Sequence, residues 1–154
     1  MPIQNVGSPA PDFDLPTDGG RVRLADLKGT KVVLYFYPKD DTEGCTIEAI
    51  DFSKRLADFK AAGAVVIGVS PDSVKSHATF RAKHDLTIPL ASDEAKAMLE
   101  AYGVWGEKSM FGRKYMGVLR TTYLIDGNGT IRRVWENVRV AGHVDEVLEA
   151  AKAI

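Results

Sequence analysis

Cys45, the only cysteine of this sequence, is the residue best suited to covalent chemistry. It follows the short apolar run 32–37 and precedes apolar residues at helical spacing, so we expect it in or just before the first turn of a helix. Free backbone N–H groups and the positive end of the helix dipole favour an anion there. They favour the thiolate, which is the nucleophilic form of cysteine. The alternative interpretation is an inert thiol, because a lone cysteine is often a small buried hydrophobe.

Length and composition indicate one folded unit. The chain has 154 residues, of which 45% are hydrophobic and 27% charged, which suffices for one core without disulfides or a structural metal. We expect a single domain over residues 1–154. The net charge of -1 provides no electrostatic footprint for nucleic acid or for an anionic membrane surface.

The sequence also predicts a cytoplasmic location. Residues 1–16 carry acids and prolines where a signal peptide would need a basic start and an apolar stretch, and no apolar run approaches membrane-spanning length. A single cysteine cannot form an internal disulfide, which fits a reducing compartment. We therefore expect neither a membrane nor a nucleic acid as a partner.

Two nearly continuous apolar runs, 32–37 and 64–69, are typical of strands buried on both faces of a sheet. Between them, apolar residues recur at steps of three and four up to Gly63, which predicts one helix with a glycine C-cap. The order strand, helix, strand favours a parallel, right-handed unit.

The second half of the chain alternates helical and strand-like patterns. One helix is expected from after Asp72 to about His84, and another carries apolar residues between 95 and 102, before Gly103. The last helix carries apolar residues between 144 and 151. The strand-like segments 121–125 and 130–135 flank an Asp-Gly-Asn-Gly turn, which is a strong hairpin signal. Together these elements predict an α/β fold of the thioredoxin-like kind, with a central mixed sheet flanked by helices.

Two segments show no regular pattern and are interpreted as loops. They are the Pro- and Gly-rich start, residues 7–20, and residues 106–117. Apolar side chains in and beside the second segment either pack onto the core, which we favour, or line an apolar entrance for a substrate. These side chains are Trp105, Met110, Phe111 and Tyr115.

Pro38, Thr42 and Cys45 form a Pro-x-x-x-Thr-x-x-Cys pattern, and in this respect the sequence resembles the peroxiredoxins. The wider run 35–42, together with residues 44–46 and 48–49, is similar to the bacterioferritin comigratory protein, or Q-type, branch of that family. The resemblance implies a peroxiredoxin-type thioredoxin-like fold and a peroxidase that reduces hydrogen peroxide and organic hydroperoxides without metal, haem or flavin. Further similar segments are 10–13 with Leu15, 68–70 with 72–73, 107–117, 120–126 and 142–143.

The resemblance implies a role for each of five residues. Cys45 would attack the terminal peroxide oxygen, release water or an alcohol, and become a sulfenic acid. Thr42 would orient the peroxide through its hydroxyl, and Arg120 would stabilise the thiolate and the charge of the transition state. Pro38 would limit solvent access, and Glu48 would hold the arginine by accepting a hydrogen bond from it.

The sequence departs from the family pattern at two positions. Ile50 stands where many Q-type members carry a resolving cysteine, and no second cysteine exists in the chain. The resemblance therefore implies an external thiol reductant, namely thioredoxin, glutaredoxin or glutathione, unless Cys45 of a second subunit resolves the sulfenic acid. Glu43 stands where the family usually has proline, and we expect it to point to solvent and to change reactivity little. The branch further implies a monomer.

Other functions are weighed against this interpretation. A peroxide sensor or redox relay would pass the oxidation of Cys45 to a partner protein, and a binding module with an inert cysteine would show no selectivity for peroxide. His77, His84 and His143 lie on different predicted elements without metal-ligand spacing, so they are interpreted as ordinary polar groups of helices and loops. No metal site and no cofactor are expected.

Overall fold

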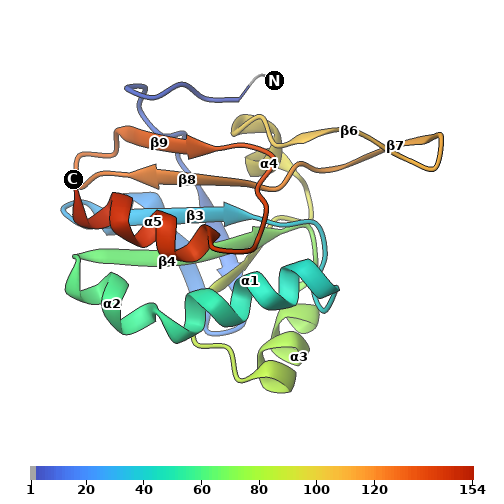
Figure 1. Ribbon diagram of the computed structural model, residues 1–154, viewed down its shortest axis with the longest axis horizontal. Helices are drawn as coiled ribbons and strands as arrows, with labels where there is room; N and C mark the ends of the chain where they lie inside the picture. The colour runs from blue at the N-terminus through green and yellow to red at the C-terminus, as the bar shows by residue number, and fades with distance from the viewer. Residues whose placement is uncertain (1–2) are drawn as a thin grey trace.

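A computed structural model describes residues 3–154 and places helices on both faces of a central sheet (Figure 1). Within these residues the sheet has seven strands in the order β2-β1-β5-β4-β3-β8-β9. Strand β4 runs parallel to β3 and β5, whereas β8 runs antiparallel to β3 and β9. The predicted mixed sheet is confirmed. Its strands are β1 Asp14–Thr17, β2 Gly20–Arg23, β3 Lys31–Phe36, β4 Ala64–Ser70, β5 Leu90–Ser92, β8 Thr121–Ile125 and β9 Ile131–Trp135.

Side chains alternate across the central strands and fill two cores, one on each face of the sheet. Val33 and Tyr35 of β3 face the core that α1, α2, α3 and α5 cover, whereas Leu34 and Phe36 face the core beneath α4. Because both faces are covered, β3 reads as a continuous apolar run. The helices are η1 Leu24–Leu27 (3-10), α1 Glu43–Lys54, α2 Leu56–Ala61, α3 Val74–His84, α4 Ala97–Ala101 and α5 His143–Lys152.

The helix predicted to run up to Gly63 is interrupted at Arg55. That residue separates α1 from α2, and its N–H is shared between the carbonyls of Asp51 and Phe52, both at 3.2 Å. The apolar face continues across the break, since Phe52 and Phe59 lie in the same core. Gly63 has a φ of 79°, as the predicted glycine C-cap requires.

Both segments interpreted as loops contain strands, so that prediction is wrong. The first includes β1 and the start of β2, an edge hairpin that joins the sheet where Thr17 pairs with Ala91. The second forms the hairpin of β6 (Trp105–Met110) and β7 (Arg113–Val118), which projects from the body of the molecule (Figure 1). Most of its side chains are exposed or half-buried, so no hydrophobic alternation marks it in the sequence.

The sheet register brings three chain segments to one end of the molecule. Phe36, the last residue of β3, pairs with Thr121 of the antiparallel β8 and with Val69 of the parallel β4. The loop that follows β3, the residue before β8 and the turn after β4 therefore meet at this end. In the described part of the chain, residues 3–154, no helix combines the length and apolar character needed to cross a membrane.

Candidate active site

Cys45 lies in the first turn of α1, as predicted, and its side chain is fully buried. Thr42 is the N-cap residue, with an extended backbone, and its carbonyl accepts the first helical hydrogen bond from the Thr46 N–H at 2.9 Å. The thiol thus lies beside N–H groups that have no partner within the helix.

Arg120 bridges Cys45 and Glu48. Its Nη2 lies 3.2 Å from Cys45 Sγ, and its Nη1 donates to Glu48 Oε1 at 2.7 Å. Cys45 and Glu48 are three residues apart and share one face of α1, so a single planar guanidinium reaches both. Arg120 immediately precedes β8, and the register of β8 with β3 carries it to the start of α1. The structure thereby brings together three of the five predicted residues.

Arg120 stays charged beside Cys45, although its other partner is a buried carboxyl group. Burial raises the pKa of Glu48 to about 7, because desolvation of the carboxylate outweighs the attraction of Arg120. Burial lowers the pKa of Arg120, but Glu48 and Cys45 together raise it above its ordinary value, so the guanidinium stays charged. Near neutral pH, Glu48 therefore neutralises only part of the charge of Arg120, whose Nη2 lies beside Cys45 Sγ.

Gly44 provides space for Arg120, a role that the sequence analysis missed. A Cβ at this position would lie 3.3 Å from Arg120 Nη2, closer than most side-chain contacts. Its φ is not positive, so the requirement is for space and not for backbone freedom. A glycine inside the first turn of a helix is the only sequence signal for this role, since glycine is unfavourable there.

Thr42 and Pro38 lie in the loop between β3 and α1. The Thr42 hydroxyl donates to the Lys39 carbonyl at 2.8 Å, and the side chain is exposed. Pro38 is half-buried in the same loop. Glu43 is exposed, which confirms that it points to solvent.

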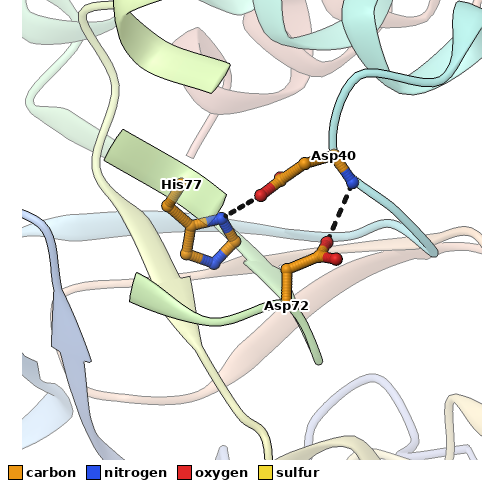
Figure 2. A group of neighbouring side chains, drawn as sticks. All are labelled: Asp40, Asp72 and His77. Carbon is orange, nitrogen blue, oxygen red and sulfur yellow. Dashed lines mark hydrogen bonds and ion pairs between the residues drawn. The ribbon is translucent and has the colours of Figure 1, made fainter. Parts of the chain in front are cut away.

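A second polar group lies beside this loop, and the sequence analysis did not foresee it. The buried side chains of His77 and Asp40 approach to 2.7 Å, and Asp72 adjoins them (Figure 2). Asp40 and His77 are far apart in sequence, so no local pattern predicts their contact. They meet because the parallel strands β3 and β4 end at the same edge of the sheet. The other two histidines contact single polar partners, with His84 near Asp41 and His143 near Thr122.

The expectation that apolar side chains at 105–115 pack onto the core is correct for one of four. Trp105 packs against the core beneath α4, whereas Met110, Phe111 and Tyr115 are exposed on the β6–β7 hairpin. Phe111 is 99% exposed at the hairpin tip.

Comparison with known proteins decides the family. Residues 6–134 match the AhpC/TSA family. The chain belongs to that family. Peroxiredoxin Bcp of Bacillus subtilis is 47% identical over 148 residues, which cover 96% of this chain and 94% of the relative. This member of the AhpC/TSA family is therefore a peroxiredoxin enzyme, and the resemblance to the bacterioferritin comigratory protein branch is confirmed.

Solved structures of this branch confirm the thioredoxin-like peroxiredoxin fold. The bacterioferritin comigratory protein of Xanthomonas campestris, described for its alkyl peroxide reduction activity, superposes with a TM-score of 0.87 at 44% identity. That match covers 92% of this chain and 90% of the other. A mutant of Xylella fastidiosa PrxQ gives a TM-score of 0.93 at 37% identity and covers 99% and 98% of the two chains.

Proposed function

We propose that this peroxiredoxin reduces hydrogen peroxide and alkyl hydroperoxides through Cys45 and is regenerated by an external thiol. The observation that carries the proposal is the 3.2 Å contact between Arg120 Nη2 and the only thiol of the chain, at the start of α1. The alkyl peroxide reduction activity described for the Xanthomonas campestris relative supports the choice of substrates.

In the first step the Cys45 thiolate attacks the terminal oxygen of the peroxide. A sulfur–oxygen bond forms, the oxygen–oxygen bond breaks, and the leaving oxygen takes a proton to become water or an alcohol. Negative charge moves from the sulfur toward the leaving oxygen, and Arg120 and the N–H groups of α1 stabilise it. The Thr42 hydroxyl donates to Lys39, so its lone pairs are available to accept a hydrogen bond from the hydroperoxide O–H.

The second step requires a thiol from outside the chain, because Cys45 is the only cysteine. A thiolate attacks the sulfur of the Cys45 sulfenic acid and forms a mixed disulfide, while the sulfenic oxygen takes a proton and leaves as water. A second thiol then attacks the reductant's sulfur in this disulfide, so that a disulfide forms between the two reductant sulfurs and Cys45 is released in its reduced form. Glutathione, glutaredoxin and thioredoxin are the reductants that we propose, and they act on a monomer.

Turnover assays with each reductant test this one-cysteine cycle. Hydrogen peroxide consumption is measured with glutathione alone, with glutaredoxin and glutathione, and with thioredoxin, for the wild type and for Cys45→Ser. We expect sustained turnover with at least one reductant and none with the variant. Oxidation of Cys45 once, without turnover by any of the three, would contradict the proposal and favour a sensor or relay.

A mass measurement tests the mixed disulfide directly. Protein oxidised by one equivalent of peroxide is mixed with one equivalent of glutathione and analysed intact without reductant. We expect the mass of one glutathione added to one chain. A disulfide-linked dimer as the main product would instead show that Cys45 of a second subunit resolves the sulfenic acid.

A further inference from the structure

The loop between β3 and α1 is held against α3 through the side chain of Asp40. Asp40 Oδ2 lies 2.7 Å from both Ser76 Oγ and His77 Nδ1, and Asp40 Oδ1 accepts from the Tyr37 hydroxyl at 2.6 Å. Asp40 is buried, and the His77 side chain is fully so. A single carboxylate therefore receives three hydrogen bonds inside the protein (Figure 2 shows the one from His77).

The main chain of Asp40 is held as well. Its N–H donates to Asp72 Oδ2 at 2.8 Å (Figure 2). The same oxygen accepts from Ser70 Oγ at 2.7 Å. Asp72 lies in the turn between β4 and α3. The loop is thus attached to this turn through its backbone and to α3 through its side chain.

Both ring nitrogens of His77 have partners inside the protein. Nδ1 faces the Asp40 carboxylate, and Nε2 lies 3.1 Å from the Ala91 carbonyl oxygen, which can only accept. Both ring nitrogens therefore have an oxygen partner within hydrogen-bond distance, and neither is free to bind a metal.

The next residue of the loop is attached to α3 too. Asp41 has a φ of 59°, a left-handed conformation that aspartate tolerates better than most residues. Its carboxylate accepts from Lys83 Nζ at 2.6 Å and lies 2.8 Å from His84 Nε2. These contacts are largely exposed, so they hold the loop less firmly than the buried contacts of Asp40.

We propose that the Asp40–His77 pair positions Cys45 and Thr42 for reaction with peroxide. His77 is a positioning residue, since it acts on the thiol through Asp40 and the loop that leads to the N-cap of α1. A displacement of about 1 Å in a reacting group can cost about 100-fold in rate, so a loosened loop slows attack on peroxide. The inference rests on the proposed function, in which Cys45 is the nucleophile.

Two variants of His77 separate its two hydrogen bonds. The amide nitrogen of Asn takes the place of Nδ1 and keeps the bond to Asp40. The amide nitrogen of Gln takes the place of Nε2 and keeps the bond to Ala91. Both variants lose the imidazole ring, so each is the control for the other.

The readouts are the rate constants of Cys45 with hydrogen peroxide and with iodoacetamide. We expect His77→Gln to lower the peroxide rate at least about tenfold and to raise the iodoacetamide rate, because the loosened loop exposes the thiol. His77→Asn should stay within about threefold of the wild type for both reagents. Equal effects of the two variants, or a parallel fall of both rates in His77→Gln, would overturn the inference.

Ser76→Ala removes the hydrogen bond that Ser76 Oγ donates to Asp40 Oδ2. This variant tests the inference even if a His77 variant does not fold. It should lower the ratio of the peroxide rate to the iodoacetamide rate, and an unchanged ratio would count against the inference. The wild-type peroxide rate separates a failure of the proposed peroxidase function from a failure of the positioning role of His77. A wild type no faster than free cysteine refutes the proposed function, whereas a fast wild type with unaffected variants refutes only the role of His77.

Discussion

Replacing Arg120 by methionine removes the cation that contacts Cys45 Sγ at 3.2 Å and leaves an apolar side chain of similar length. Loss of one donor to the developing charge of a transition state costs about 2.7 to 4 kcal/mol. Each 1.36 kcal/mol corresponds to a factor of about ten in rate. We therefore expect Arg120→Met to lower the rate of Cys45 oxidation by hydrogen peroxide about 100- to 1000-fold.

The same substitution strips Glu48 of its partner, and a second variant separates this effect from the first. Glu48 is fully buried, and its carboxyl, with a pKa already raised to about 7, becomes protonated without Arg120. An unsatisfied buried polar group costs about 1 to 3 kcal/mol of stability. In the double variant Arg120→Met/Glu48→Met no such group remains, so most of this stability should return while the peroxide rate stays low.

Stopped-flow oxidation and urea unfolding of the reduced protein provide the two measurements. A double variant that regained the wild-type peroxide rate together with its stability would show that Arg120 acts only through packing. A single variant that reacts within about threefold of the wild type would refute the electrostatic argument outright.

Three further predictions follow from neighbouring residues. Gly44→Ala should lower the peroxide rate severalfold, because the added Cβ lies 3.3 Å from Arg120 Nη2. Urea unfolding should show undiminished stability, since alanine favours the helix by about 0.5 to 1 kcal/mol. An unchanged peroxide rate would contradict the steric argument. Thr42→Val should lower the peroxide rate about tenfold at an unchanged iodoacetamide rate, and equal losses with both reagents would contradict a role toward peroxide. Burial lowers the pKa of His143 to about 4. The unfolded state therefore binds this proton more readily than the folded state, and stability is lost as pH falls below about 6.5. Urea unfolding should show about 2 kcal/mol less stability at pH 5 than at pH 7 from this group, and His143→Gln should lack this loss.

Local pattern predicted the elements that carry the thiol. Strands β3 and β4 are buried on both faces, so their apolar runs are visible in the sequence, and Cys45 lies in the first helical turn after β3. The proximity of Arg120 to Cys45 was predicted only through the family resemblance. It depends on the antiparallel register of β8 with β3, which no local pattern encodes.

The features that were missed depend on contacts distant in sequence or on exposed strands. Asp40 and His77 are 37 residues apart, and their pairing requires β3 and β4 to end together. The β6–β7 hairpin buries little apolar surface, so its best sequence signal is Gly112 at the tip, with a φ of 77°. The break at Arg55 leaves the apolar spacing nearly intact and is therefore not visible in the periodicity.

The most direct test of the central claim is the rate at which the reduced protein gains one oxygen atom from one equivalent of hydrogen peroxide. Rapid quenching and intact mass analysis follow the reaction, and peptide mapping locates the oxygen. The account predicts a single oxygen on Cys45, added orders of magnitude faster than to free cysteine and removed by subsequent addition of thiol. Addition no faster than to free cysteine would show that Arg120 and the α1 N-terminus do not activate the thiol, and would contradict the account.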